Sequence, residues 1–426
     1  MNEACDEATT RTLRGCGTLS RKLVLNRLAL MREGELTLIE GTEQWLFGRA
    51  TPACPLQATI VVHDPSFWSD IAYGGSLGAG ESFTQGVWST DRLTTVMRIL
   101  LRNREVLDGM ETGLARLQEP LLKTLHWLRR NTIAGARRNI AAHYDLGNHF
   151  FETFLDETMM YSCAIFEHPD MSLYEASVAK LDRICRKLAL GPEDHVMEIG
   201  TGWGGFAIHA ATHYGCHVTT TTISEAQYRH AKTQVDVAGL SDRVNVLLLD
   251  YRDLEGSYDK LVSIEMVEAV GHDHLDEFFG CCSRLLKPDG MMLLQGITIA
   301  DHRYEAARRS VDFIKRYIFP GCCIPSVASV SAAVGRATDL RLFHLEDIGP
   351  HYALTLRAWR HNLLSNADRI RAQGFSDAFL RMWTFYLCYC EGGFAERALG
   401  DAQMLLVKPQ CRREPMLPSL VADNAG

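Results

Sequence analysis

The feature that most constrains the fold is an apolar run that ends in a glycine-rich turn, from Val196 to Gly205. A helix-compatible segment, Phe206 to Ala211, follows the turn directly. This order is typical of the first strand and first helix of a doubly wound α/β sheet, in which glycines let the backbone approach a ligand. The sequence therefore predicts an α/β domain with a ligand site at this turn.

Two kinds of ligand suit such a turn. A dinucleotide site would show the pattern G-x-G-x-x-G and an acidic residue at the end of the next strand. Here the loop that begins at Gly200 reads G-x-G-x-G-G, and the next predicted strand, His217 to Ile223, ends in threonines. Glu198, just ahead of the turn, suits a cationic sulfonium nucleoside, so we interpret the turn as a site for S-adenosylmethionine. A strand–helix turn without a ligand is the alternative that this loop alone leaves open.

The spacing of β-like runs predicts the rest of this domain, because they alternate with helical patterns. Seven strands, the last paired with the sixth like a hairpin, are the methyltransferase variant of the doubly wound sheet. Two long insertions, Asp301 to Asp339 and Leu354 to Asp401, are rich in aromatic residues, and we expect them to form a chamber for an oily substrate. The predicted strands are Val196 to Gly200, His217 to Ile223, Val244 to Asp250, Lys260 to Glu265, Met291 to Ile299, Leu340 to Asp347 and Met404 to Val407.

The N-terminal part has a different pattern. The runs Glu35 to Glu40 and Gln44 to Gly48 predict a β-hairpin, which Ala58 to Val62 continues, so we expect a small α+β domain. The glycine-dense segment Gly74 to Glu81 lacks the Gly-Lys-Ser/Thr ending of a phosphate loop. Apolar positions between residues 94 and 130 recur at helical intervals. We expect an N-terminal domain at residues 1–125, a helical linker to about residue 140, a catalytic domain at 141–410 and a tail at 411–426.

Composition and charge exclude several classes of protein. The net charge of −8 argues against a general nucleic-acid binder, and the hydrophobic content of 46% is that of a globular chain. No apolar run reaches the roughly 18 residues of a membrane-spanning helix, and no basic-then-apolar signal segment is found, so a cytoplasmic location is expected. The basic stretch from Lys123 to Arg138 is either a solvated linker or a contact with anionic headgroups. We predict no metal site, because His143, His209, His272 and His274 lack a ligand spacing.

Six motifs in the same order give a family resemblance. From about Ala141 to Pro409 the chain resembles cyclopropane-fatty-acyl-phospholipid synthases and mycolic-acid cyclopropane synthases. The resemblance implies a class I S-adenosylmethionine methyltransferase fold and a small N-terminal domain for lipid handling and dimerisation. It also implies a homodimer bound peripherally to the inner face of the membrane. The motifs are His143 to Asn148, Tyr161 to Ala164, Gly200 to Gly205, Asp250 to Asp253, Tyr317 to Gly321, and Ile324 to Ser326.

The activity implied is transfer of a methyl group from S-adenosylmethionine to the cis double bond of an unsaturated acyl chain in a membrane phospholipid, followed by closure of a cyclopropane ring. Glu198 ahead of the turn suits the donor. Asp250 at the end of the third strand suits its adenine edge, and ordinary capping of the strand end is the alternative. The resemblance adds the rest of the donor site. The expected residues are Tyr161, Ser162, Glu198, Gly200, Thr201, Gly202, Trp203, Gly204, Thr222, Ile223, Ser224, Gln227, Asp250, Tyr251 and Arg252.

The resemblance also implies a bound bicarbonate as the base that removes a proton. Its expected holders are Cys163, Glu268, Gln295, Ile297 and Tyr352. Cys390 aligns with a cysteine once proposed as catalytic in these enzymes, and a buried thiol in the pocket wall is the alternative. Aromatic residues are expected to line the acyl channel or to form core: Phe313, Tyr317, Phe319, Trp359, Trp383 and Tyr386.

The chain departs from the family pattern at two positions. Gln295 stands where a histidine is usual, and Ala269 replaces the histidine of Glu-His-Val-Gly. A glutamine carries no positive charge and exchanges no proton, which leaves a methyl- or methylene-branched fatty acid as an alternative product. A nucleic-acid or protein methyltransferase is disfavoured, because an acidic and apolar segment, Glu265 to Glu268, follows the fourth strand in place of an amine-binding motif. A lipid-binding protein with a decayed centre is the alternative from another class.

Overall fold

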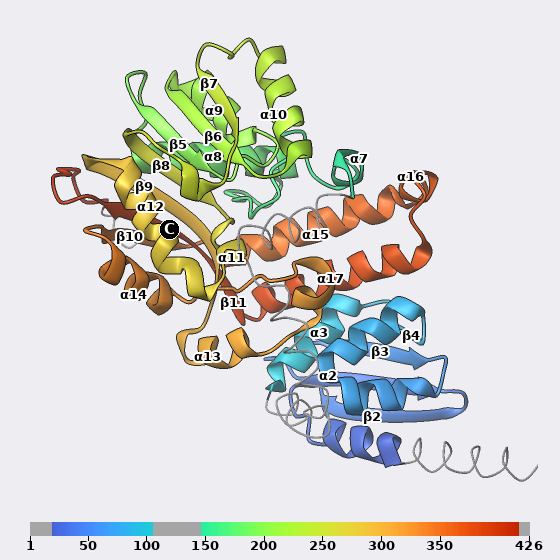
Figure 1. Cartoon of the computed structure of the whole chain (residues 1–426). Helices are drawn as coiled ribbons and strands as arrows, with labels where there is room; N and C mark the ends of the chain where they lie inside the picture. Colours follow the sequence, from blue (N-terminus) through green and yellow to red (C-terminus); the bar gives the residue numbers. More distant parts are fainter. Residues whose placement is uncertain (1–18, 105–145, 417–426) are drawn as a thin grey trace, which may run out of the picture.

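The computed structural model describes residues 19–104 and 146–416. A small sheet with its helices and a large seven-stranded sheet with its helices form two parts of the molecule (Figure 1). The predicted linker to about residue 140, the basic stretch from Lys123 to Arg138, and His143 lie outside the described residues.

The small sheet contains the predicted hairpin. Strands β1 (Gly34–Glu40) and β2 (Glu43–Arg49) pair antiparallel, and β3 (Gln57–Val62) lies parallel to β1. The short strand β4 (Trp88–Ser89) completes the order β2-β1-β3-β4. Helix α3 (Leu93–Arg102) packs on β1 and β3 and begins the helical region that the sequence predicts after residue 94.

The glycine-dense segment is part of a helix. Helix α2 (Ser66–Gln85) runs through it, with a break where Gly75 adopts φ 55°. A Cβ atom on Gly80 would lie 2.3 Å from the ring of Phe313, so the missing side chain lets this aromatic residue of the large part pack on the helix. Close packing of a neighbour therefore explains Gly80, in agreement with the exclusion of a phosphate loop.

The large sheet has the order β10-β11-β9-β8-β5-β6-β7. Neighbouring strands from β5 to β9 are parallel, whereas β11 is antiparallel to both β9 and β10. This is the class I methyltransferase fold that the sequence predicts. The strands are β5 (His195–Ile199), β6 (His217–Thr222), β7 (Val244–Leu248), β8 (Tyr258–Ile264), β9 (Leu286–Ile299), β10 (Arg341–Asp347) and β11 (Leu399–Val407).

Two of the predicted strands begin five residues earlier in the structure than the sequence predicts. β9 begins at Leu286 rather than Met291, and β11 begins at Leu399 rather than Met404. The two strands pair continuously from Leu399 opposite Ile299 to Val407 opposite Met291. Polar residues such as Asp401 therefore lie in a central strand, because the cross-strand bonds extend it beyond its apolar run.

Helices cover both faces of the large sheet. Val196 of β5 packs with α8 (Leu173–Leu188) and α9 (Gly205–Tyr214), whereas Met197 packs on the other face with α12 (Leu275–Leu285) and α14 (Val327–Ala337). This alternation follows from the two-residue period of a strand. The other helical segments are α7 (Asn148–Phe151), α10 (Glu225–Val237), η2 (Tyr251–Asp253), α11 (Val267–Val270), η3 (His272–His274), α13 (Asp301–Arg309), η4 (Ile314–Ile318), α15 (Gly349–Ser365), α16 (Ala367–Ala372) and α17 (Asp377–Ala395).

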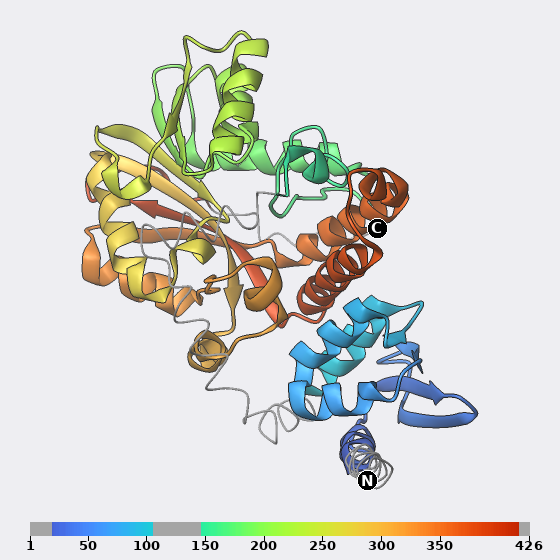
Figure 2. The same cartoon turned by 45° about the vertical axis from the view of Figure 1, so that its right-hand side comes forward.

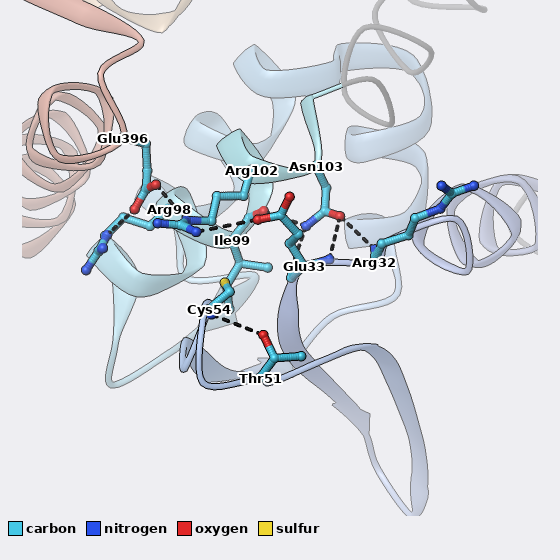
Figure 3. Close-up of polar contacts among 9 residues, drawn as sticks. All are labelled: Arg32, Glu33, Thr51, Cys54, Arg98, Ile99, Arg102, Asn103 and Glu396. Atoms are coloured by element: carbon cyan, nitrogen blue, oxygen red, sulfur yellow. Dashed lines mark hydrogen bonds and ion pairs between the residues drawn. The ribbon is translucent and has the colours of Figure 1, made fainter.

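The second predicted insertion forms most of a helical hairpin that joins the two parts. α15 and α17 run side by side, and α17 packs on α2 and α3 of the small part (Figures 1 and 2). Gly392 allows this approach, because a Cβ atom there would lie 2.8 Å from the Cβ of Met97. Glu396, just after α17, accepts hydrogen bonds of 2.6 Å from both Arg98 and Arg102 of α3 (Figure 3).

In the described part of the chain, no helix is both long enough and apolar enough to cross a membrane.

Candidate active site

A cavity of about 830 Å³ opens at the carboxyl edge of the large sheet. The loops that follow β5, β6, β7 and β8 form one end of the cavity, and α17 with the α13–η4 segment forms another wall. Ser76, Leu101 and Arg104 of the small part also line it. The cavity therefore connects the glycine turn with apolar side chains of both insertions.

The glycine turn holds a backbone that other residues rarely adopt. Gly200, Gly202 and Gly204 have φ angles of 104°, 54° and 95°. The amides of Gly200 and Thr201 both donate to the carbonyl of Thr221, at 3.1 and 3.0 Å, which fixes the turn against β6. The turn is thus fixed in a shape that leaves its outer side open to the cavity.

Glu198 is a buried carboxyl group at the end of β5 and lines the cavity. Its Oε2 accepts a 2.6 Å hydrogen bond from Thr220, whose hydroxyl also contacts that of Thr201 at 2.7 Å. Burial raises the pKa of Glu198 to about 8, although the Thr220 hydrogen bond and the charge of Lys180 oppose the shift. A cation in the cavity would favour the ionised form.

Most of the predicted donor residues line this cavity. Gly204 and Ser224 lie behind its wall and act as N-caps, Gly204 for α9 and Ser224 for α10, where the Ser224 hydroxyl accepts from the amide of Gln227. Asp250 caps η2 in the same way, through the amide of Arg252 at 3.1 Å. The residues in the cavity wall are Tyr161, Ser162, Glu198, Gly200, Thr201, Gly202, Trp203, Thr222, Ile223, Gln227, Asp250, Tyr251 and Arg252.

A second polar centre surrounds Glu265, which follows β8 and lines the cavity. Its Oε1 accepts from the amide of Cys163 at 2.7 Å and from Nε2 of Gln295 at 2.9 Å. Its Oε2 accepts from the hydroxyl of Tyr352 at 2.6 Å. The backbone of Glu265 has φ 48° and is held by a 2.8 Å bond from its amide to the carbonyl of Gln295.

Two more carboxyl groups lie beside Glu265. Burial, and then the charge of Glu265, raise the pKa of Glu268 to about 8 and that of Asp401 well above its ordinary value. Glu268 Oε1 accepts from the amide of Ile297, and its Oε2 is buried without a hydrogen-bond partner among the described residues. Asp401 accepts a longer, 3.3 Å bond from Gln295. Both groups are therefore favoured in their protonated form.

The residues predicted to hold a base lie around this centre. Glu268, Ile297 and Tyr352 line the cavity, whereas Cys163 and Gln295 are fully buried behind its wall. The thiol of Cys163 is directed to the carbonyls of Ala164 and Ile348, so only its backbone amide faces Glu265. Burial and the nearby carboxylates raise the pKa of the Cys163 thiol, which keeps it protonated.

A chain of hydrogen bonds orients the amide of Gln295. Its Oε1 accepts from Gln403 at 3.0 Å, and Gln403 accepts from the ammonium of Lys187 at 2.8 Å. Because the oxygen of Gln295 is engaged in this way, its NH₂ group points to Glu265.

The six aromatic residues that the sequence leaves as channel or core divide between these two places. Phe319 and Tyr386 line the cavity, and Tyr386 contacts the hydroxyl of Tyr161 at 2.9 Å. The other four, Phe313, Tyr317, Trp359 and Trp383, are absent from the cavity wall. Phe313 instead packs between α2 and Phe385 of α17, and Trp359 and Trp383 pack around Phe154 in the core.

Cys390 lines the cavity from α17. Burial raises the pKa of its thiol far above the ordinary value, so the sulfur stays protonated. This favours a wall residue over a nucleophile.

Sequence reasoning missed Glu265 and Asp401 as site residues. The acidic segment from Glu265 to Glu268 served only to disfavour other methyltransferases, and Asp401 carries no local motif. The available signal for Glu265 is its place at the carboxyl end of the fourth strand, where ligands of such sheets lie. Within the described residues, no group of three or more His, Cys, Asp or Glu side chains is placed to hold a metal.

The sheet, the glycine turn and the cavity at its carboxyl edge define a class I methyltransferase. The chain belongs to the mycolic acid cyclopropane synthetase family, whose model matches residues 132–404. It is an S-adenosylmethionine-dependent lipid C-methyltransferase of this family.

Relatives of the chain include two bacterial enzymes that match most of its length. Tuberculostearic acid methyltransferase UfaA1 of Mycobacterium tuberculosis is 37% identical over 404 residues, 90% of each chain. Cyclopropane-fatty-acyl-phospholipid synthase of Escherichia coli strain K12 is 38% identical over 345 residues, 80% of this chain and 85% of that one. The solved structure of mycolic acid cyclopropane synthase CmaA1, complexed with SAH and CTAB, matches with a TM-score of 0.60 and 33% identity over 64% of this chain and 98% of that one.

Proposed function

We propose that the protein transfers the methyl group of S-adenosylmethionine to the cis double bond of unsaturated acyl chains in membrane phospholipids and forms a cyclopropane ring. The observation that carries this proposal is the single cavity that connects the glycine turn and Glu198 with an apolar, aromatic chamber containing buried carboxyl groups. Such a cavity is suited to an apolar chain and a cationic nucleoside at the same time.

The residues of the first polar centre fit the methyl donor. Glu198 offers a buried carboxyl group to a cationic amino acid portion, and the glycine turn leaves backbone close to the cavity. Asp250, Tyr251 and Arg252 would hold the nucleoside portion. When bound, S-adenosylmethionine supplies an electrophilic methyl group on a positively charged sulfur.

The cavity wall supplies what the reaction needs from the protein. An alkene is a weak nucleophile, so the acyl chain must be held in line with the methyl group and away from water. Methyl addition leaves a carbocation on the chain, which the ring faces of Tyr161, Phe319 and Tyr386 would stabilise. A base must then remove a proton.

A bicarbonate ion does not fit this structure as that base. The resemblance assigns it to donors that include the Cys163 position, Gln295 and Tyr352, and all three already donate to the carboxylate of Glu265.

A methyl- or methylene-branched fatty acid is the second candidate product. The similarity to a tuberculostearic acid methyltransferase over 90% of both chains favours it, as does Gln295 at the position where a histidine is usual. The cyclopropane and the methylene-branched product both require loss of a proton after methyl transfer, so they use the same site, whereas a methyl-branched product requires a hydride from a reductant.

Product analysis tests the proposal. The purified protein is incubated with S-adenosylmethionine and vesicles of oleoyl phospholipid, and the fatty acids are examined by mass spectrometry and proton NMR. A product heavier by one CH₂ without an alkene proton signal, and with cyclopropane resonances, is expected. A signal of a terminal =CH₂ group would identify the methylene-branched product, and binding of vesicles without any product would favour the lipid-binding alternative.

Peripheral membrane contact and a homodimer also belong to this proposal. The substrate lies in a bilayer, so we expect the protein to bind the cytoplasmic surface of the membrane and to do so as a dimer, since two weak contacts multiply each other. Co-sedimentation with anionic and neutral vesicles, together with sedimentation velocity, tests both expectations.

A further inference from the structure

We propose that Glu265 is the base of the reaction and that its side-chain carboxylate takes the place of an external anion. The inference rests on the proposed methyl transfer to an alkene. The donors that the resemblance assigns to bicarbonate already donate their hydrogen bonds to Glu265.

The donors around Glu265 form a site for an anion, and the side chain of Glu265 itself occupies this site. Three donors from three separate segments converge on its two oxygens, at 2.6, 2.7 and 2.9 Å. These three donated hydrogen bonds fix the orientation of the Glu265 carboxyl group at the cavity wall. The Glu265 carboxyl group is thus bound by Cys163, Gln295 and Tyr352, the same donors that a free anion would need at this place.

The two neighbouring acids are less suited to act as a base. Glu268 and Asp401 both have raised pKa values, because burial and the charge of Glu265 favour their neutral forms. Glu268 is also the neighbour with the unpartnered buried oxygen, whereas both oxygens of Glu265 are engaged. Of these three acids, Glu265 is therefore the one whose carboxyl group is oriented by three donors from separate segments at the cavity wall.

The backbone of Glu265 supports a functional role for this residue. Its φ of 48° lies in the left-handed region, which a residue with a side chain adopts at a cost in free energy. The bond from its amide to the carbonyl of Gln295 at 2.8 Å maintains this conformation at the end of β8. The conformation places the carboxylate among its three donors at the wall of the cavity.

The reaction needs no reactant other than the methyl donor, the alkene and Glu265. The double bond's electron pair forms a bond to the methyl carbon, whose bond to sulfur breaks with its electrons left on sulfur. The neighbouring chain carbon becomes a cation. A Glu265 oxygen takes a proton from the new methyl group, and the C–H electron pair closes the ring.

For the branched product, a hydride first moves from the methylated carbon to the cationic carbon. The same proton loss from the methyl group then forms a methylene double bond. In either case Glu265 becomes a neutral carboxylic acid and returns its proton to water after the product leaves.

The test compares the wild-type protein with Glu265→Gln and Glu265→Gly in buffer freed of carbon dioxide, with and without added bicarbonate. Oleoyl phospholipid vesicles serve as substrate. Wild-type activity is expected to be the same in both buffers, and Glu265→Gln is expected to lose at least about 100-fold in rate, the usual contribution of a general base. Glu265→Gly, which opens the anion site, is expected to recover activity with added bicarbonate or formate.

Two controls separate loss of the base from loss of structure. Binding of S-adenosylhomocysteine, measured by calorimetry, is expected to be unchanged in both Glu265 variants, because the donor end of the cavity is formed by other residues. Glu193→Gln removes an exposed carboxylate before β5 and is expected to leave activity unchanged.

Three results would overturn the assignment. They are wild-type activity that requires bicarbonate, an active Glu265→Gln protein, and a Glu265→Gly protein that binds S-adenosylhomocysteine but responds to no added anion. Wild-type protein that makes no methylated lipid in either buffer would instead overturn the proposed function.

Discussion

At the scale of single residues, the site contains three buried acids and one partly buried acid in different surroundings. Glu198, Glu268 and Asp401 have raised pKa values because burial disfavours their charge, whereas Glu265 is surrounded by hydrogen-bond donors. The two ends of the cavity therefore differ in the chemical group that they suit. The Glu198 end suits a cation, and the Glu265 end accepts a proton.

The raised pKa of Glu198 predicts proton release when the donor binds. With a pKa of about 8, most of this carboxyl is protonated at pH 7, and a cationic ligand must shift it to the ionised form. Affinity for S-adenosylmethionine is therefore expected to rise as the pH increases toward 8 and to level off above it.

Calorimetry in buffers of different ionisation enthalpy measures the released proton directly. Glu198→Gln serves as the control, because it keeps the size of the side chain and should bind more weakly without this release. Equal proton release by both proteins would show that another group titrates.

Cys390 is expected to be dispensable for chemistry. Burial and the nearby charge of Asp312 both raise the pKa of its thiol and keep it protonated. Cys390→Ala should retain methyl transfer within a few-fold, and in the wild-type protein the Cys390 thiol should stay inert to thiol reagents in the absence of substrate. A loss of more than about 100-fold in kcat with an unchanged KM would restore the catalytic interpretation of this cysteine.

At the scale of elements, the predictable parts are those with local signals. The run from Val196 to Gly205 predicts both β5 and the donor turn, because apolar residues and glycines there are adjacent in sequence. Gln295 and Gln403 are different, since they meet only through the pairing of β9 with β11. Glu265 lies next to these two glutamines because Ile264 of β8 is opposite Gln295 where β8 pairs with β9. The second polar centre thus depends on strand order and register, which a single sequence does not specify.

Helix α2 shows the same limit for packing. Its glycines disfavour a helix locally, yet Gly80 is required where Phe313 and Phe385 approach. Tertiary contacts determine the structure of this segment.

Gly80→Ala is therefore expected to destabilise the protein. The new Cβ atom would lie 2.3 Å from the ring of Phe313 and 2.8 Å from that of Phe385, and overpacking of this kind costs about 1–3 kcal/mol. Thermal unfolding followed by circular dichroism should show a lower Tm. Gly335→Ala in α14 is the matched control, because nothing lies within 4 Å of its Cβ position and alanine stabilises a helix by up to about 1 kcal/mol. A Tm of Gly80→Ala at or above that of the control would contradict the close packing.

At the scale of the whole molecule, the small part completes the catalytic cavity. Ser76, Leu101 and Arg104 line the cavity together with residues of the large sheet, so its size depends on how the two parts dock. The docking surface is formed by α17 against α2 and α3. The donor end of the cavity lies among the loops after β5, β6 and β7, apart from this surface.

Glu396 connects the two parts through charge. Its side chain is only 8% exposed and accepts from both Arg98 and Arg102 at 2.6 Å. Arg102 also reaches Glu33 ahead of β1, at 3.4 Å. Asn103 accepts from the amides of Arg32 and Glu33, which extends the contact to the first strand (Figure 3).

Glu396→Gln is expected to loosen this docking while leaving the donor site intact. Hydrogen bonds to a charged group contribute about 1.5–3 kcal/mol each, and the partial exposure of the two arginines places the loss at the lower end of that range. The KM for phospholipid vesicles should rise several-fold with little change in affinity for S-adenosylhomocysteine. Hydrogen exchange should accelerate in α2 and α3 and stay constant in β5 to β9.

Glu305→Gln is the matched control for this variant, because Glu305 also has two arginine partners, Arg308 and Arg309, but both lie on its own helix, α13. It should change neither the KM nor the exchange of α2 and α3. If Glu396→Gln raised exchange equally in both sheets, the residue would support overall stability. If Glu396→Gln changed neither the KM nor the exchange, packing at Gly80 and Gly392 would be sufficient to hold the small part in place. Apolar contacts alone would then keep the small part against the cavity.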